Sequence, residues 1–366
     1  MRTKRLYSLD ALRGFDMFWI LGAEEIFHHL AEITNSTFWN ALSVQFTHPT
    51  WHGFSFYDLI FPLFLFLAGV ATPYSLGKQI KNGKNRQSLL TRIIKRGLIL
   101  VVLGIIYNNG LQILPLNEIR FASVLGRIGL AYMFANIIYL YTKQPGQIIW
   151  CISLLIGYWI LLLFNSAPGY PVGDLTMEGN FASYLDTLIM PGKLYRIIHD
   201  PEGLVSTIPA ISTALLGIFT GNLLKNTSIE KNKNSALRLV LIGIILVVLA
   251  QIWNLVFPIN KNLWTSSFTL QCGGISMILM AIFYYVIDVL GYKKWAFFFK
   301  VIGMNSILIY MSVVFINWSN TTSSLFQWLG QIVGEPYDVV VLLFCSLAVQ
   351  WIFLYILYKK ELFLRV

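Results

Sequence analysis

The chain has 366 residues, of which 56% are hydrophobic and only 12% are charged, and its mean hydropathy is +0.65. A soluble globular protein carries about twice that charged fraction, so the composition excludes an ordinary soluble enzyme or binding domain. The net charge of +10 is scattered over short connections between apolar runs, which fits a membrane protein better than a nucleic-acid-binding surface. We therefore expect an all-α polytopic integral membrane protein, embedded in a lipid bilayer, with one transmembrane domain over residues 1–366.

Apolar runs long enough to cross a bilayer recur along the whole chain. Their lengths and the turn residues between them predict about ten transmembrane helices, at residues 9–30, 54–76, 93–111, 123–141, 148–164, 204–224, 236–257, 268–290, 296–316 and 337–358. If the N-terminus is cytoplasmic, 20 of the 27 Lys and Arg residues face the cytoplasm, among them Arg2, Lys4, Arg5, Lys231 and Arg365. All five histidines then lie at the exoplasmic face, beside a loop at about 165–203 that is long enough to cover a site.

Charged residues occur at the start of the first predicted span. Asp10, Arg13 and Asp16 are spaced by three residues and share one face of a helix. Charges at membrane depth are costly unless they are paired or face a cavity. A structural Asp10–Arg13 ion pair is the simpler interpretation, and the functional alternative is that Arg13 helps to hold a phosphate.

Two acid–histidine pairs lie at the far end of the same span. Glu24 and Glu25 each precede a histidine, His28 or His29, by four residues, which is one helical turn. Zinc would need a further marked ligand, which the pattern lacks, so we expect no metal here. We expect these groups to line a polar vestibule on the exoplasmic side.

The stretch from residue 47 to 69 concentrates the residues best suited to chemistry. His48, Trp51 and His52 precede an apolar helix, and Asp58 is predicted to lie inside that helix. Trp51 and the histidines are also typical of a membrane interface. However, Pro62 removes the helical hydrogen bond to the carbonyl of residue 58, so we expect a kink and a cavity beside Asp58. A histidine near such a cavity can serve as a general base.

Three further features need partners. Arg127 lies inside the fourth predicted span and requires an anion, which Asp58, an exoplasmic glutamate or a ligand could supply. The seven cations between residues 78 and 96, including Lys95 and Arg96, form either a cytoplasmic anchor or an attraction for a polyanionic cofactor. Asn305 lies deep in the ninth span, where a helix–helix hydrogen bond is the simplest explanation.

Six segments, in this order, resemble the heparan-alpha-glucosaminide N-acetyltransferase family of transmembrane acyltransferases. They are RLYSLDALRG (5–14), HPTWHG with DLIFP (48–53 and 58–62), VLGRIG (124–129), DPEG (200–203), NKNLWT (260–265) and GMNSI (303–307). The resemblance spans nearly the whole chain. It implies one acyltransferase domain that moves acetyl from cytosolic acetyl-CoA to the amine of a terminal glucosamine across the membrane.

The resemblance also implies roles for individual residues. The family's active-site histidine precedes Trp-x-Gly and corresponds to His48, whereas His52 stands where the family usually has Asn. We expect His48 to be the base or the acetyl carrier, with Asp58 or a vestibule glutamate orienting its ring. The remaining expected site residues bind the acceptor (Glu24, Glu25, Trp51, Arg127 and Trp264) or acetyl-CoA (Arg13, Lys95, Arg96 and Asn305).

Two departures from lysosomal members point to a bacterial relative in the inner membrane. Those members carry an exoplasmic domain and a span before the first motif, which here lies close to Met1. They also have an Asn-Tyr-Gly-type segment where this chain has Glu24 and Glu25. The favoured acceptor is a periplasmic amino sugar or glycan, and a homodimer is left open. The alternatives are a polysaccharide O-acyltransferase and a non-enzymatic sugar transporter.

Overall fold

The structure is a computed structural model that describes residues 6–225 and 232–364. Within these ranges the chain is helical without an extended strand, which confirms the predicted all-α class. The predicted cytoplasmic cations Arg2, Lys4, Arg5, Lys231 and Arg365 lie outside the described residues.

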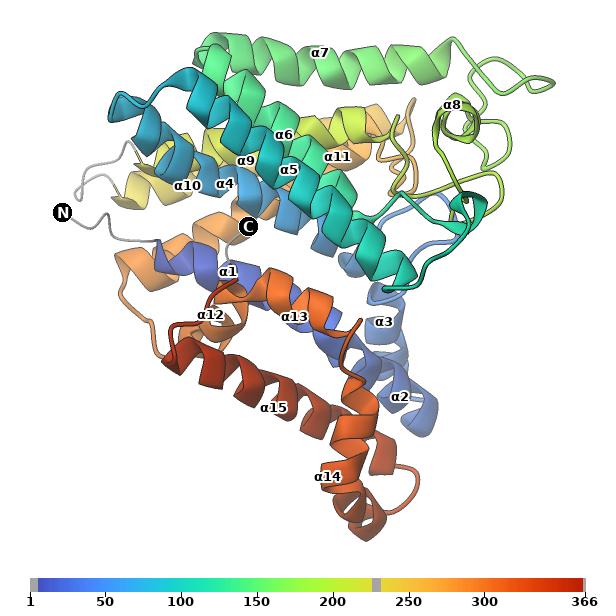
Figure 1. Cartoon of the computed structure of the whole chain (residues 1–366), viewed down its shortest axis with the longest axis vertical. Helices are drawn as coiled ribbons and strands as arrows, with labels where there is room; N and C mark the ends of the chain where they lie inside the picture. Colours follow the sequence, from blue (N-terminus) through green and yellow to red (C-terminus); the bar gives the residue numbers. More distant parts are fainter. Residues whose placement is uncertain (1–5, 226–231, 365–366) are drawn as a thin grey trace. The chain divides into compact units, whose positions relative to one another are not determined.

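Figure 1 shows the helices in chain order. The α-helices are α1 (Tyr7–Phe18), α2 (Glu24–Thr34), α3 (Thr37–Gln45), α4 (Ile60–Lys81), α5 (Arg86–Asn109), α6 (Val124–Tyr141), α7 (Gln144–Leu163), α8 (Phe181–Ile189), α9 (Thr207–Lys225), α10 (Asn232–Asn254), α11 (Ser266–Phe283), α12 (Ala296–Met304), α13 (Ser306–Ser312), α14 (Trp318–Val333) and α15 (Asp338–Lys359). Shorter turns of 3₁₀ or π geometry occupy Trp19–Ala23, Phe56–Leu59, Leu116–Glu118 and Tyr284–Val289.

Seven helical stretches in the described residues are long and apolar enough to cross a membrane. They are 56–81, 124–141, 144–163, 207–225, 233–254, 266–289 and 338–359. They confirm a polytopic membrane protein, while the count of ten spans stays a prediction. The other three predicted spans are helical but differ from a plain apolar span: α5 begins in a basic segment, 9–30 is interrupted at Gly22, and 296–316 is broken at Asn305.

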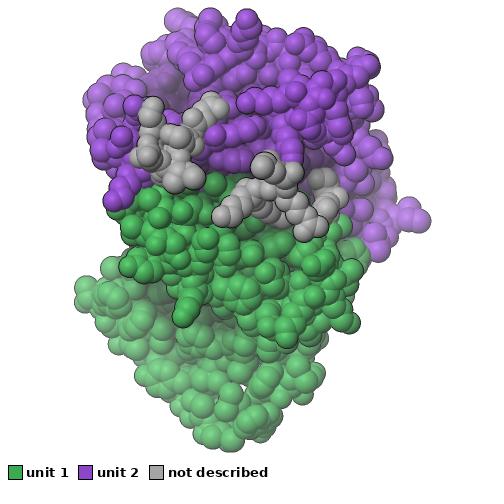
Figure 2. Space-filling view, turned by 90° about the vertical axis from the view of Figure 1, so that its left-hand side faces the viewer, with its two compact units in different colours: residues 1–49, 55–60, 282–365 green, residues 50–54, 61–281, 366 purple. Residues whose placement is uncertain are grey.

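The described residues form two compact units, coloured green and purple in Figure 2. The first unit comprises residues 6–49, 55–60 and 282–364, and the second comprises 50–54 and 61–281 apart from 226–231. Nothing in this division tests the predicted single domain, which stays a prediction.

In the first unit, α1 packs against α12 at two glycines. A Cβ atom on Gly14 would overlap the backbone carbonyl of Phe299, and one on Gly303 would overlap that of Asp10. The two backbones therefore touch, which is the close approach that small residues permit between membrane helices. The long helix α15 packs against α12 and α14, as Figure 1 shows.

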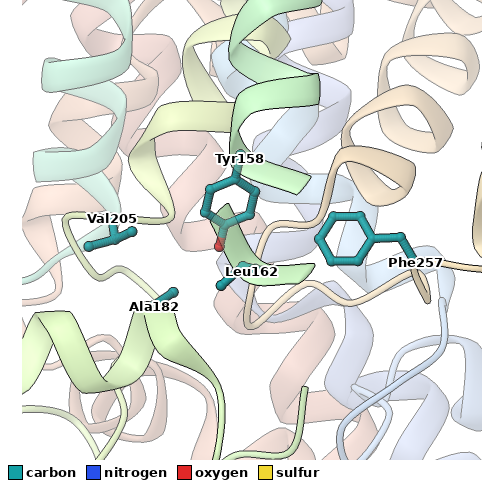
Figure 3. Packing of buried hydrophobic residues seen from close by; sticks show 5 residues of the cluster. All are labelled: Tyr158, Leu162, Ala182, Val205 and Phe257. Carbon is teal, nitrogen blue, oxygen red and sulfur yellow. The ribbon is translucent and has the colours of Figure 1, made fainter. Parts of the chain in front are cut away.

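In the second unit, α4 is the most enclosed of the spanning helices together with α9. These two helices cross at Gly69 and Gly217, where an added Cβ would again overlap a facing carbonyl. A buried cluster closes one end of this unit: Tyr158 and Leu162 of α7 meet Ala182 of α8, Val205 and Phe257 (Figure 3). The hydroxyl of Tyr158 donates to the carbonyl of Leu263 over 2.7 Å. This cluster holds the long loop after α7 against the ends of the helices.

Candidate active site

An aromatic cluster in the first unit anchors the loop that carries His48. Phe46 is buried and its ring lies 4.8 Å from that of Trp19 and 4.7 Å from that of Phe27. Phe56, on the other side of the loop, lies 5.5 Å from both Phe46 and Trp19. Both ends of the segment 46–56 are thus fixed in one apolar cluster.

His48 and Asp58 form a direct pair in this unit. The Nδ1 atom of His48 lies 2.7 Å from Oδ1 of Asp58. The Asp58 side chain is 1% exposed and that of His48 is 44% exposed, so a buried carboxylate supports an accessible imidazole. Because a carboxylate only accepts hydrogen bonds, the contact favours the tautomer with its proton on Nδ1 and the basic lone pair on Nε2.

Asp58 is itself held by the backbone. Its Oδ2 accepts from the amide of Ser55 at 2.9 Å and from the Ser55 hydroxyl at 3.3 Å. The amide of Asp58 in turn bonds the carbonyl of Ser55 at 3.1 Å. These bonds form a capping box at the start of a 3₁₀ turn. The capping box fixes the position of the carboxylate without any contribution from His48.

The kink expected at Pro62 is not needed to place Asp58. Asp58 lies within the spanning stretch 56–81, as predicted, but in its first turn, the 3₁₀ turn Phe56–Leu59, and α4 begins at Ile60. Pro62 therefore falls in the first turn of α4, where a backbone N–H has no helical partner and proline is tolerated. The proline inside α4 is Pro73. The position of Asp58 follows from the capping box and not from a helix opened by Pro62.

Tyr57 and Glu24 extend the His48 pair. The Tyr57 ring lies 5.0 Å from the His48 ring, and its hydroxyl donates to Oε1 of Glu24 over 3.0 Å. Glu24 begins α2 directly after a π-helical turn that contains Gly22 at φ 104°, a conformation that glycine adopts without steric cost. Glu25, the neighbouring predicted residue, is exposed.

In the second unit, Trp51 and His52 contact two loops. The indole N–H of Trp51 donates to the carbonyl of Leu175 at 2.7 Å, and its ring lies 5.1 Å from that of His199. His52 Nδ1 lies 3.2 Å from the side-chain nitrogen of Asn260, so the amide donates to the imidazole. Burial lowers the pKa of His52, which keeps this imidazole neutral.

Arg127 is completely enclosed in the second unit. Its Nη2 donates to the Gly203 carbonyl at 3.1 Å and to the Ser206 hydroxyl, and its guanidinium lies 4.9 Å from the centre of the Trp264 ring. Trp264 is fully buried and has φ 49°, an uncommon conformation for a residue other than glycine. The sequence assigned both residues to acceptor binding, and the structure packs them together.

Two carboxylates grip the other arginine of this region. Arg120 donates from Nε and Nη2 to the two oxygens of Asp200 at 2.8 and 2.7 Å, and Nη2 also pairs with Glu202. Burial disfavours charge on Asp200, but the hydrogen bonds from Arg120 outweigh it and lower the pKa of Asp200. Burial raises the pKa of Glu202. The DPEG segment thus holds Arg120 in a buried pair of salt bridges, which we call the ionic bracket, in the loop before α9.

Two buried titratable groups lie beside this bracket. Burial raises the pKa of Asp186 from 3.8 to about 6, although its Oδ1 accepts from the amides of Leu204 and Val205. Burial lowers the pKa of His199 from 6.5 to about 4, and its Nδ1 lies 2.7 Å from the Ser183 hydroxyl. Asp186 therefore carries a proton more readily, and His199 less readily, than in water.

The residues predicted to bind acetyl-CoA come from three places in the described chain: α1, α5 and the break between α12 and α13. Arg96 donates a hydrogen bond to the Tyr132 hydroxyl at 2.9 Å. Asn305 lies between α12 and α13, where its side-chain amide donates to the carbonyl of Leu362 and accepts from the amide of Leu364. Lys95 is exposed beside a groove of about 490 Å³ that runs along α5 from Thr91 to Leu103. Arg13 lies on α1, and its charge acts on Asp16. Acetyl-CoA binding by these four stays a prediction.

Residues 5–257 match the model of the heparan-alpha-glucosaminide N-acetyltransferase catalytic family. The chain belongs to the heparan-alpha-glucosaminide N-acetyltransferase family. It is 27% identical to the Homo sapiens protein of that name over 99% of this chain and 60% of that protein. The Mus musculus protein is 28% identical over 88% of this chain and 56% of its own length. The chain thus spans about three fifths of the length of these curated relatives.

This family match confirms the resemblance inferred from the six sequence segments, and the apolar helices make the chain an integral membrane protein. In the described residues, no group of three or more His, Cys, Asp or Glu side chains is placed to hold a metal ion.

The sequence assigned no site role to Tyr57, Ser55, Asp186 or Arg120. A tyrosine and a serine among apolar residues look like interface residues. Asp186 lies on the short helix α8, in a segment that the sequence predicted as part of the loop at about 165–203. The DPEG segment was a usable signal for the ion pairs with Arg120, because acidic side chains in an apolar membrane protein are usually paired with cations.

Proposed function

We propose that this chain transfers the acetyl group of cytosolic acetyl-CoA to the amine of an amino sugar, glucosamine or a close relative, on the exoplasmic side of the membrane. The observation that carries the proposal is the His48–Asp58 pair in a member of this family: an accessible imidazole whose Nδ1 contacts a buried, backbone-held carboxylate. This arrangement suits proton transfer or nucleophilic attack at Nε2.

The chemistry follows from the tautomer. The amine nitrogen attacks the thioester carbonyl of acetyl-CoA and forms the C–N bond, the C–S bond breaks, and Nε2 of His48 takes a proton from the nitrogen. Asp58 stabilises the imidazolium through Nδ1, in the way that a carboxylate supports the histidine of a catalytic triad. The imidazolium then gives its proton to the departing CoA thiolate, so His48 is restored.

A second route uses the same atom as an acetyl carrier. Nε2 of His48 attacks the thioester first, CoA leaves, and the amine then takes the acetyl group from the imidazole. Incubating the purified protein with acetyl-labelled acetyl-CoA in the absence of an acceptor separates the routes. The carrier route labels His48 and releases one CoA per protein, whereas the base route leaves the protein unlabelled.

The test of the proposed function uses purified full-length protein, acetyl-CoA, and a panel of amino sugars and neutral sugars. We expect acetyl transfer to an amine, and we expect His48→Ala to lower kcat by about a hundredfold or more while the protein stays folded. The matched control is His52→Asn, which removes a different imidazole but keeps a side-chain amide that can bond Asn260. Equal activity of wild type and His48→Ala would refute the assignment.

The same panel separates the other functions. Transfer to neutral sugars alone would identify an O-acyltransferase. Sugar counterflow in proteoliposomes without consumption of acetyl-CoA would identify a transporter.

A further inference from the structure

Glu24 has one satisfied oxygen and one unsatisfied oxygen. Oε1 accepts the hydrogen bond from Tyr57, while Oε2 is buried and has no hydrogen-bond partner among the described residues. No lysine or arginine in the described part of the chain forms an ion pair with Glu24. Leaving a carboxylate oxygen buried without a donor is costly, so a further donor at Oε2 would stabilise this side chain.

Tyr57 links this carboxylate to His48. Its ring packs on the imidazole at 5.0 Å, and its hydroxyl, at the opposite end of the ring, donates to Glu24. The chain therefore places a carboxylate one phenol ring away from the imidazole. His48 Nδ1 is occupied by Asp58, which leaves Nε2 as the basic atom of the ring. A ligand donor at Glu24 would therefore be linked to the imidazole through the Tyr57 ring.

The negative charge around Glu24 indicates what kind of group would donate to Oε2. Glu25 lies next to Glu24 and adds negative potential. The negative charge of this pair of carboxylates favours a donor that is itself positively charged. An ammonium group supplies both positive charge and several N–H donors, whereas a sugar hydroxyl supplies one donor and no charge.

We propose that Glu24 and Tyr57 form an ammonium-binding subsite beside His48, which selects positively charged amine acceptors over neutral sugars. This inference rests on the proposed function and names its acceptor class. The acceptor binds as R–NH3⁺ with a hydrogen bond to Glu24 Oε2. It first releases one proton to water, which gives the nitrogen its lone pair. As the C–N bond forms and the C–S bond breaks, His48 takes the second proton and passes it to the CoA thiolate.

The subsite predicts a loss of amine affinity rather than of chemistry. Glu24→Gln keeps the shape of the side chain and an oxygen for Tyr57 but removes the charge. We expect the KM for glucosamine to rise about tenfold or more, with kcat changed by less than about threefold. Tyr57→Phe keeps the ring against His48 and loses the hydroxyl, so its KM should rise by a smaller factor.

The matched control is Glu32→Gln, which removes an exposed carboxylate two turns along the same helix that pairs with His29. It should leave both constants unchanged. Glu24→Asp should restore part of the affinity that Glu24→Gln loses. Calorimetry on the purified full-length protein should show that wild type binds glucosamine more tightly than glucose, and that Glu24→Gln removes this preference.

The outcomes separate this subsite from the proposed function. If His48→Ala abolishes transfer but Glu24→Gln and Tyr57→Phe keep the wild-type KM, the subsite is refuted and the proposed function stands. If wild type acetylates no amine, the proposed function fails, and calorimetry still decides the subsite. Equal binding of glucosamine and glucose by wild type would refute the subsite directly. If Glu24→Gln does not fold, Tyr57→Phe and the wild-type binding comparison carry the test.

Discussion

Asp58 serves two partners with its two carboxylate oxygens. Oδ1 contacts His48 and Oδ2 accepts from Ser55 at the start of the 3₁₀ turn. From the sequence alone, Asp58 was the preferred candidate to orient the imidazole, and a vestibule glutamate was the alternative. Distance along the chain could not decide between them, because the capping box that aims Asp58 depends on backbone geometry around Ser55.

This double role predicts different results for two substitutions. Asp58→Asn keeps an oxygen for the Ser55 amide but no longer stabilises an imidazolium, so kcat should fall by about a hundredfold or more with little change in thermal stability. Asp58→Ala also removes the cap and should in addition lower stability by about 1 kcal/mol. Steady-state kinetics and thermal melting measure both effects. Wild-type kcat in Asp58→Asn would contradict the role given to Asp58.

Asp186 and His199 predict opposite dependences of stability on pH. The folded-state pKa of His199, about 4, lies below its value of 6.5 in water, so its contribution is present above pH 6.5 and is lost as pH falls towards 4. The folded-state pKa of Asp186, about 6, lies above 3.8, so its contribution is present below pH 3.8 and is lost as pH rises through 6. Each effect is about 3 kcal/mol, and they nearly cancel.

Removing one of the two groups should make the pH dependence of stability caused by the other group measurable. On acidification from pH 6.5 to 4.5, Asp186→Asn should lose stability relative to wild type, and His199→Gln should gain it. Thermal melting of the three proteins across this range measures the differences. A change of the same sign in both variants would contradict the assigned protonation states.

The breaks between helices were harder to predict than the helices. Runs of apolar residues predicted the helical stretches because a spanning helix must be apolar over most of its length. The break at Gly22 and the one at Asn305 depend on single residues within such runs. Hydropathy does not register a positive φ at one glycine, nor an asparagine that bonds a distant segment such as Leu362.

The crossing of α1 and α12 predicts a sharp difference between glycines. Gly14→Ala or Gly303→Ala forces two backbones apart, so we expect a loss of about 1–3 kcal/mol, seen as a lower melting temperature. The control is Gly157→Ala on α7, where an added Cβ meets no atom within 4 Å. It should be neutral or slightly stabilising. Equal melting temperatures of Gly14→Ala and Gly157→Ala would contradict the close crossing.

At the scale of the whole molecule, the sequence predicted the class but not the division into two units. Helix α12 begins nearly 290 residues after α1 begins, and the apolar character of the two segments does not identify them as partners. The small residues Gly14 and Gly303 lie at the contact, but the chain also has glycines that make no such close contact, for example Gly157. Partner choice depends on shape, which hydropathy omits.

The predicted orientation in the membrane depends on α5. This helix has 24 residues and would be about 36 Å long, enough to cross, but its first half is basic. If α5, α6 and α7 all cross, the loop at residue 84 and the loop at residue 178 face opposite sides. Lys84→Cys should then react with an impermeant maleimide from the cytoplasmic side, and Glu178→Cys from the other side, in a background without native cysteines. Labelling of both from one side would mean that α5 does not cross.

The most direct test of the central claim is vectorial transfer in sealed proteoliposomes that carry the purified full-length protein in one orientation. Labelled acetyl-CoA is supplied on the side of Lys84, and glucosamine is enclosed on the other. We predict that wild type forms N-acetylglucosamine only in the compartment of the amine, and that His48→Ala forms it at about a hundredth of that rate or less. Equal product with His48→Ala, or transfer only when both substrates share one side, would contradict a transmembrane acetyltransferase that acts through His48.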